Sequence, residues 1–335
     1  MTNIQDVAKV AGVSVATVSR VLNNSSSVSA RTRENVLKAI KELNYQPNLL
    51  GRNLRRMEAR MILVLLPNIS NPFYSRVVKG IEDVARKNDY FIMLCNTDSD
   101  ASQEKLYLKL LKNRLSDGVI FLAPELKKEE LSEIGINYPT VQCCEYKEGA
   151  RVSHVTIDNY AAGYNAVKHL IDLGHKRIGL ISCRNNFVST KQREAGYRKA
   201  LEDSGIDFDS RLITYGDYSF MSGMRCARQL LDLEGGVTAI FAISDVMAIG
   251  AMRAVKEKNM SVPKDIAVVG FDNISFASMS DPMLTTISQP KYEIGCTAMN
   301  LLLEQIKGSI KESRHIVLEH ELIVRESTVG HSMNN

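Results

Sequence analysis

Short apolar runs alternate with amphipathic stretches from about residue 61 to about residue 330. The runs are MILVLLP (61–67), YFIMLCN (90–96), DGVIFLA (117–123), PTVQCC (139–144), RIGLISC (177–183), LITYGD (212–217), AIFAIS (239–244) and IAVVGFD (266–272). Runs without alternating polar residues are typical of parallel strands that are buried on both faces. The regular β–α alternation therefore predicts a doubly wound α/β fold, and the length of the region indicates two lobes.

The first 46 residues follow a helical period instead. The expected buried stripe of a first helix comprises Ile4, Val7, Ala8 and Ala11. We expect Thr2 and Gln5 to form its capping box. Gly12 would end this helix, and Ser14 would cap a second helix that buries Val18, Val21 and Leu22. A third helix is expected over residues 31–43, with Val36, Ile40 and Leu43 inside. Two short helices joined by a tight turn are the helix-turn-helix pattern, which periodicity alone does not distinguish from other helical hairpins.

The outer face of the second helix is small and nearly uncharged. It carries Ala16, Ser19 and Arg20, with Val15 and Thr17 at its margins. A face this low fits a DNA major groove about 12 Å wide, where Arg20 can pair with guanine. Val15 and Ala16 can offer apolar contact only, for example to a thymine methyl group.

Charge and short hydroxyl side chains support the same interpretation. Residues 1–60 hold ten Lys and Arg against four Asp and Glu, whereas the rest of the chain is slightly acidic. A basic segment of this kind suits a polyanion, although a solvated helix surface would have a similar composition. The short polar side chains expected near phosphates are Ser14, Thr17, Ser19, Asn23, Ser29 and Thr32.

The stretches IQDVAKVAGVSVATVSRVLNN and VSARTRENVLKAIKELNYQPN resemble the head of the LacI/GalR family of bacterial transcription regulators. The resemblance implies that Val15, Ala16 and Arg20 read bases and that Tyr45 and Asn48 approach the DNA backbone. It also implies a hinge helix that starts near Pro47 and places Leu54 in the minor groove, beside the same Leu of a second subunit. Gly51 and the pair Arg55–Arg56 depart from the usual hinge pattern, and GRNLRR is similar to the cytidine-repressor branch.

The body resembles a two-lobed periplasmic sugar-binding protein. We therefore expect a helix-turn-helix domain at 1–46, a hinge helix and linker at 47–60, and an effector-binding and dimerisation domain at 61–330. The first lobe would comprise about 61–157 and 290–314, and the second about 158–289 and 315–330. Crossovers are expected near 157–160, 287–291 and 313–317.

Polar residues follow several of the expected strands, where ligands collect in open α/β sheets. Asp245 follows AIFAIS, Asp272 ends IAVVGFD, and Gln289 ends TTISQ. Arg193 and Tyr218 lie in loops or helices nearby, and the resemblance adds Asn71, Phe73 and Tyr74 from ISNPFY. Asp245 could instead cap a helix, Arg193 could form a surface ion pair, and Tyr218 could be plain core. Hydroxyl-pairing groups beside aromatic rings predict a neutral sugar or nucleoside as effector.

Other functions find little support. No run of about 18 apolar residues predicts a membrane span, and MTNIQDVAKV lacks the apolar segment of a secretion signal, so we expect a cytoplasmic protein. The six cysteines lack CxxC or CxxH spacing and are expected to be reduced, with Cys143 and Cys144 on opposite faces of one strand. We expect no metal and no cofactor, because GxxxxGK[ST], GxGxxG, HExxH and GxSxG are all absent.

We therefore expect a repressor that binds a pseudo-palindromic, double-stranded operator as a homodimer. No heptad tail follows LIVRESTV, which favours a dimer over a tetramer. The rival classes are a carbohydrate-processing enzyme and a stand-alone solute-binding protein. The missing motifs disfavour the first, and the basic head disfavours the second.

Overall fold

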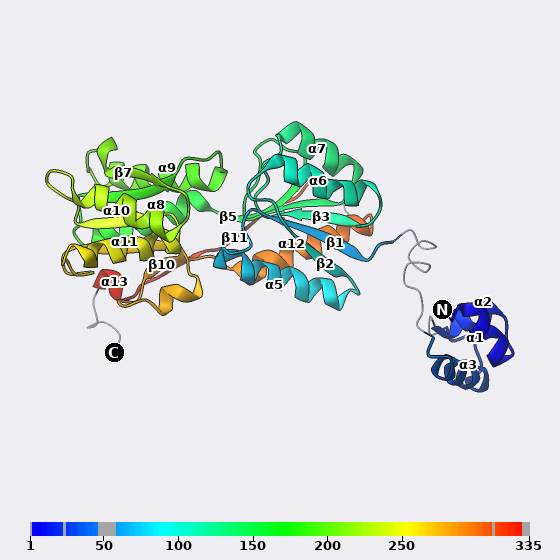
Figure 1. Cartoon of the computed structure of the whole chain (residues 1–335). Helices are drawn as coiled ribbons and strands as arrows, with labels where there is room; N and C mark the ends of the chain where they lie inside the picture. The colour runs from blue at the N-terminus through cyan, green and yellow to red at the C-terminus, as the bar shows by residue number, and fades with distance from the viewer. Residues whose placement is uncertain (1, 23–24, 46–57, 310–311, 330–335) are drawn as a thin grey trace. The chain divides into compact units, whose positions relative to one another are not determined.

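The computed structural model of the chain describes residues 2–22, 25–45, 58–309 and 312–329. The chain divides into two compact units, Met1–Ala59 and Arg60–Asn335. Figure 1 shows small helices in the first unit and two α/β lobes in the second.

The described part of the first unit contains three short helices. They are α1 (Ile4–Ala11), α2 (Val15–Leu22) and α3 (Ala30–Glu42). Gly12 ends α1 with a φ of 65°, a left-handed conformation that glycine adopts at little cost. The helices agree with the sequence prediction to within a residue or two.

The predicted capping box was displaced by one residue. Asn3 is the N-cap of α1, and its side chain accepts hydrogen bonds from the backbone N–H groups of Gln5 and Asp6. The Asp6 carboxylate accepts the Asn3 N–H in return, at 2.9 Å. Thr2 instead donates its hydroxyl to the Leu43 carbonyl at 3.3 Å, which ties the start of the unit to the end of α3. Asn is a better N-cap than Thr, so residue preference agrees with the observed cap at Asn3 rather than at Thr2.

The core of the first unit is small. Its buried residues are Val7, Ala8, Val18, Val21, Val36 and Ala39. Partly buried side chains pack around them, namely Ile4, Ala11, Val13, Leu22, Val28, Ile40, Leu43 and Tyr45. The predicted buried stripes of the three helices are confirmed. The expected hinge, with Asn48, Gly51 and Leu54, lies outside the described residues, as does Asn23.

The first lobe of the second unit is built on a six-stranded sheet of order β11-β5-β4-β3-β1-β2. Its strands are β1 (Met61–Leu66), β2 (Phe91–Asn96), β3 (Gly118–Phe121), β4 (Thr140–Cys143), β5 (Ser153–Ile157) and β11 (His315–Leu318). Every neighbouring pair in this sheet is parallel. Strand β2 is an edge of the sheet, and Phe91, Met93 and Leu94 on it are exposed.

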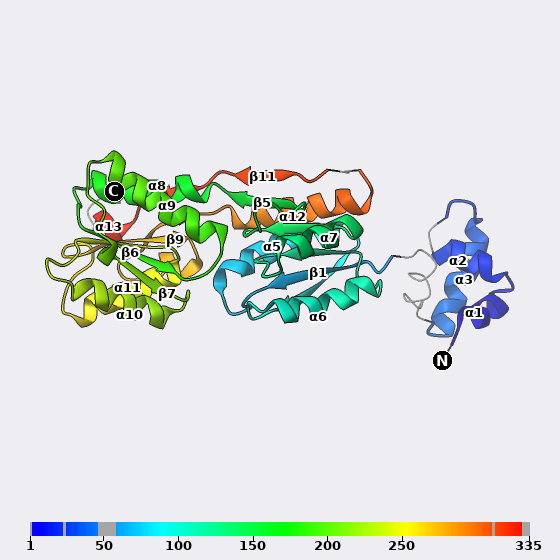
Figure 2. The ribbon, with the colours of Figure 1, turned by 90° about the horizontal axis from the view of Figure 1, so that it is seen from above.

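Helices cover both faces of this sheet. They are α5 (Pro72–Lys87), α6 (Ala101–Lys112), α7 (Lys128–Asn137) and α12 (Lys291–Ile306). Alternate residues of β1 face opposite sides: Ile62 and Val64 pack in the cluster that includes α5 residues, whereas Leu63 packs with α6 residues. Figure 2 shows α12 and α6 on opposite sides of β1. Strands that are buried on both faces explain why the apolar runs lack polar alternation.

The second lobe repeats this architecture with the order β12-β10-β9-β8-β6-β7. Its strands are β6 (Ile178–Cys183), β7 (Ile213–Gly216), β8 (Ala239–Ala242), β9 (Ala267–Asp272), β10 (Thr285–Ser288) and β12 (Glu321–Ile323). Only β12 is antiparallel to its neighbour among these paired strands. The covering helices are α8 (Asn159–Asp172), α9 (Val188–Asp203), α10 (Phe220–Leu231), α11 (Asp245–Glu257) and α13 (Glu326–Val329). The doubly wound, two-lobed fold is confirmed.

The chain passes between the lobes after β5, β10 and β11. The first two crossovers lie where the sequence predicted them. The third was predicted too early, because residues 315–318 form β11, which pairs with β5 in the first-lobe sheet. The chain therefore enters the second lobe between Leu318 and Glu321, where β12 begins. The short strand β11 was missed because alternate residues in it are exposed.

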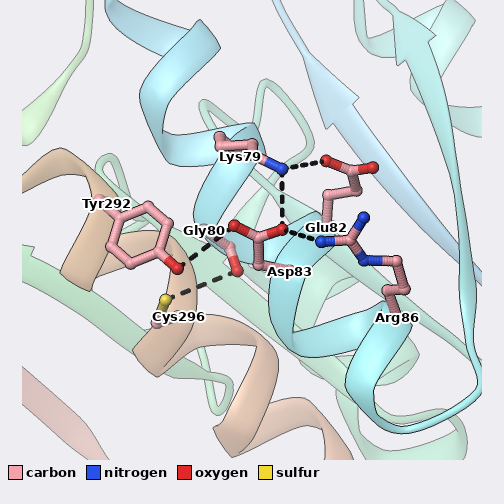
Figure 3. A network of polar contacts seen from close by, with 7 residues as sticks. All are labelled: Lys79, Gly80, Glu82, Asp83, Arg86, Tyr292 and Cys296. Carbon is pink, nitrogen blue, oxygen red and sulfur yellow. Dashed lines mark hydrogen bonds and ion pairs between the residues drawn. The ribbon is translucent and has the colours of Figure 1, made fainter.

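Helices α5 and α12 approach each other closely. A Cβ on Gly80 would lie 2.2 Å from the Tyr292 carbonyl oxygen, so glycine is required for this packing. Figure 3 shows Asp83 between the two helices, where it accepts hydrogen bonds from Lys79, Arg86 and Tyr292. Asn71, just before α5, and Gln289, two residues before α12, line the cavity described below.

Cys143 and Cys144 depart from the expected arrangement. Strand β4 ends at Cys143, and Cys144 has a φ of 71°, so the chain no longer alternates between faces. The two sulfur atoms consequently lie 3.8 Å apart rather than on opposite faces. All six cysteines are free thiols. No described helix is long and apolar enough to cross a membrane.

Candidate DNA-binding face and ligand cavity

Helix α2 separates a buried face from an exposed one. Val18 and Val21 are buried in the core of the first unit. On the other side, Ala16 and Arg20 are exposed, and Val15 is 37% exposed although it is apolar. The exposed face of α2 is therefore a low, convex surface from which the long cationic side chain of Arg20 projects.

Hydroxyl side chains position the ends of the helices around this face. The Ser14 hydroxyl accepts the Thr17 N–H at 3.2 Å and also bonds the Thr17 hydroxyl at 2.9 Å. Ser29 caps α3 in the same way through Thr32. These residues therefore shape the helix starts, while Ser19 is half-buried on α2 and Tyr45 packs against the core. Their contacts with phosphates remain a prediction.

A cavity of about 340 Å³ lies between the two lobes of the second unit. Its size suits a small molecule. Residues of both lobes line it, and they include most of the side chains that the sequence predicted. These are Asn71, Phe73, Tyr74, Arg193, Tyr218, Asp272 and Gln289.

Arg193 is held rigidly in the second-lobe wall. It is 7% exposed, its Nε donates to Asn159 Oδ1 at 2.9 Å, and its Nη1 donates to the Ile243 carbonyl at 2.8 Å. Its guanidinium also stacks on the Phe271 ring, with Cζ 3.6 Å from the ring centroid. The alternative of a surface ion pair is therefore wrong for Arg193.

Asp272 occupies a strained corner at the end of β9. Its φ is 112°, and the next residue, Asn273, has a φ of 51°. Gln289 donates its amide to Asp272 Oδ1 at 2.7 Å, and the Lys291 ammonium donates to the carbonyls of both corner residues. Burial raises the pKa of Asp272 to about 6, against the opposing influence of Arg193 and Lys291. Strain of this kind often accompanies a functional site, because surrounding contacts must maintain it.

Aromatic side chains of both lobes line the cavity. Phe73 and Tyr74 follow Asn71, which caps α5 by accepting the Phe73 N–H at 3.0 Å. Tyr218 has a φ of 66°, and its hydroxyl bonds Thr190 at 2.9 Å. Burial raises the pKa of both tyrosines, so they remain neutral hydrogen-bonding groups. Tyr218 is therefore not plain core, since it lines the cavity.

Asp245 does not line this cavity. It is fully buried at the start of α11, where Ser244 is the N-cap. Its carboxylate accepts the Ile274 N–H at 2.8 Å and the Thr286 hydroxyl at 2.5 Å. Burial raises its pKa to about 8. The prediction that Asp245 contacts the effector is thus corrected: it supports the segment that follows Asp272.

Several lining residues were not anticipated. They include Asp98 and Ser99 after β2, Glu145 after β4, Phe187 and Ser189 at the start of α9, and Asp217 after β7. Most follow a strand end, so the rule that selected Asp272 could have found them. Among the described lining residues, four carboxylates face a single guanidinium, that of Arg193. The cavity is therefore unfavourable for anions. The described residues contain no cluster of three potential metal ligands.

Comparisons with known proteins match both units of the chain. Residues 3–48 match "Bacterial regulatory proteins, lacI family", and residues 167–328 match "Periplasmic binding protein-like domain". The transcriptional repressor CytR of Escherichia coli (strain K12) is 41% identical over 326 residues, which are 97% of this chain and 96% of CytR.

Two solved structures are similar along nearly the whole chain. The Lac repressor dimer bound to operator and the anti-inducer ONPF has a TM-score of 0.88 at 31% identity, covering 98% of this chain and 99% of that one. A complex of the regulator CelR with cellobiose has a TM-score of 0.74 at 33% identity, covering 98% and 100%. With this coverage, the helix-turn-helix unit and the two-lobed body identify the chain as a ligand-responsive transcription regulator of the LacI family.

Proposed function

We propose that the protein represses transcription by binding a pseudo-palindromic operator as a homodimer, and that a neutral sugar or nucleoside in the inter-lobe cavity controls it. The single observation that carries the proposal is the cavity, in which Arg193 and Asp272 are fixed in a buried polar wall opposite aromatic side chains. The same chain also carries α2, whose exposed face is low and holds one Arg. The protein thus combines small-molecule recognition with DNA reading. Operator binding places this function in the cytoplasm.

On DNA, Arg20 pairs with a guanine edge while Val15 and Ala16 lie against base methyl groups. Ser14, Thr17, Ser19 and Ser29 contact phosphates, as does Tyr45. Asn23, Asn48 and Leu54 belong to the same proposal by family resemblance. Exposure of Val15 and Arg20 on one side of α2 supports it.

Two exposed apolar patches support a dimer. Along the edge strand β2, Phe91, Met93 and Leu94 are 68%, 39% and 41% exposed. In the second lobe, Phe276 and Met279 are 54% and 72% exposed. Apolar patches of this kind often mark protein interfaces, and the similar Lac repressor structure is a dimer. A second copy of this chain is the partner that we propose for them.

The charge of the cavity favours a neutral effector. Carboxylates accept hydrogen bonds from hydroxyl or amino groups, whereas a phosphate would meet several negative charges and only one guanidinium. The aromatic side chains of Phe73, Tyr74 and Tyr218 suit the apolar face of a sugar or base. The resemblance of GRNLRR to the cytidine-repressor branch favours a nucleoside over a sugar.

The test is a thermal-shift and calorimetric screen of the full chain with ribose, cellobiose, cytidine, adenosine and glucose 6-phosphate. We expect a neutral compound to raise the melting temperature and to change affinity for a DNA site selected from a random pool. A shift with glucose 6-phosphate alone, or the absence of a selected DNA site, would contradict the proposal.

A further inference from the structure

Glu145 lines the cavity and connects the two lobes. It follows β4 in the first lobe, and only 6% of its surface is exposed. Its carboxylate accepts the Val188 N–H at 2.7 Å, the Ser189 N–H at 3.3 Å and the Ser189 hydroxyl. Val188 and Ser189 form the first turn of α9 in the second lobe, so these bonds run from one lobe to the other.

Helix α9 depends on this carboxylate for its cap. Its own N-cap residue is Phe187, whose side chain cannot accept a hydrogen bond. The first N–H groups of a helix need acceptors, and an anion at that end also favours the helix dipole. Glu145 supplies both from the opposite lobe, which is the role that Ser or Asp usually plays within a helix's own sequence.

The segment that carries Glu145 is fixed to the first-lobe sheet. Thr156 donates its hydroxyl to the Cys144 carbonyl at 3.0 Å, and the Lys147 N–H donates to Gln142 Oε1 at 2.8 Å. Gln142 lies on β4 and Thr156 on β5. The carboxylate therefore cannot follow α9 if the lobes separate, and the bonds must break.

Helix α9 also carries the polar wall of the cavity. Arg193 lies on it, and Thr190 bonds the Tyr218 hydroxyl. We propose that Glu145 is a positioning residue: a latch that caps α9 across the cleft and holds Arg193 and Tyr218 where the effector meets them. The effector then binds a prepared, closed arrangement, and its apparent affinity depends on the fraction of molecules in which the latch is formed.

The test compares Glu145→Gln with Glu148→Gln in the full chain. Glu148 lies in the same segment but is exposed, so its substitution removes an equal charge without touching α9. A Gln at 145 presents an amide donor toward N–H donors, which breaks part of the cap. Ser189→Ala, which removes one donor only, serves as a milder variant should Glu145→Gln fold poorly.

The first measurement needs no ligand. Hydrogen exchange of the Val188 and Ser189 amides should accelerate about tenfold or more in Glu145→Gln, less in Ser189→Ala, and not in Glu148→Gln. The chain contains no Trp, so Phe187→Trp at the start of α9 provides a unique fluorophore. Its emission should shift to longer wavelength and its acrylamide quenching should increase when the latch is broken. Unchanged exchange and emission would overturn the latch.

The second measurement concerns the effector, and here the inference rests on the proposed function. For whichever neutral compound the screen identifies, Glu145→Gln should weaken binding about fivefold or more while Glu148→Gln binds normally. Faster exchange with unchanged affinity would overturn the positioning role and leave a local helix cap. If no compound binds, the exchange and emission results still decide the latch, so its failure and that of the proposed function are distinguishable.

Discussion

The two recognition surfaces of this protein are built in opposite ways. The face of α2 in the first unit is convex, and the side chains that we propose read DNA point outward from a core of a few small apolar residues. The cavity in the second unit is concave, and its polar side chains are buried and already bonded to one another. Both surfaces belong to one chain, yet one presents exposed side chains and the other presents buried side chains that are already hydrogen-bonded.

The two surfaces differ in when their side chains lose conformational entropy: during binding on α2, and during folding in the cavity. Arg20 is exposed, so pairing with a base must order its long side chain at the time of binding. Arg193 is buried, and Asn159, Ile243 and Phe271 fix it before any ligand arrives. A prepared site rejects ligands that leave its groups unpaired, so we expect the cavity to discriminate more sharply than the α2 face does.

The largest effect that separates the two surfaces should come from Asp272→Asn. Asn tolerates a positive φ better than Ala, so the strained corner is retained while the anionic acceptor is lost. We expect effector affinity to fall about 100-fold or more, because donors that face a buried carboxylate lose their partner. Calorimetry with the neutral compound from the screen measures this loss.

Operator affinity without effector should be unchanged in the same protein. Asp207→Asn, at an exposed position of the second lobe, is the matched control and should behave as the parent chain does. A normal effector response in Asp272→Asn would remove Asp272 from the site.

Arg20→Ala should produce the reciprocal result. Loss of a bidentate pair with guanine costs about 1–3 kcal/mol on the selected site and little on random DNA. Arg31→Ala, which removes the same charge from exposed α3, should weaken both DNAs to a similar extent. Fluorescence anisotropy at one fixed salt concentration measures both. Equal weakening of both DNAs by Arg20→Ala would reduce Arg20 to a phosphate contact.

The pH dependence of effector binding should be smaller but diagnostic. Burial raises the pKa of Asp272 to about 6, so its carboxylate, which we propose accepts ligand hydroxyls, becomes protonated as the pH falls through that value. Affinity for a neutral effector should therefore be constant above about pH 7. It should fall by up to about tenfold per unit below pH 6, because each unit reduces the ionised fraction by that factor. In Asp272→Asn this dependence should be absent, and an identical pH profile there would assign the titration to another group.

Sequence reasoning recovered much of this architecture because apolar periodicity reports burial directly. Asp272 and Gln289 were found by the rule that ligands gather at strand ends. Glu145 was missed as a functional residue because its partners, Val188 and Ser189, are about 43 residues away in sequence and meet it only after both lobes fold. Asp245 was placed wrongly because its carboxylate, at the start of α11, bonds Thr286 of β10 and does not line the cavity. Periodicity predicts elements, whereas such side-chain pairings depend on tertiary structure.

The smallest effect tests whether the two units differ in stability as they do in core size. Gly12 and Gly174 both have a positive φ, 65° and 93°, and in both cases an added Cβ would meet nothing within 4 Å. Gly→Ala at either position should therefore cost about 1 kcal/mol through backbone strain alone. The same free energy should lower the melting temperature of the small first unit by about 4–8 °C and that of the larger second unit by about 2–4 °C or less, because the unfolding entropy grows with size. Differential scanning calorimetry of the full chain measures both transitions. Equal shifts of one shared transition would show that the two units unfold together. The contrast between the first unit and the cavity of the second unit would then not extend to their stability.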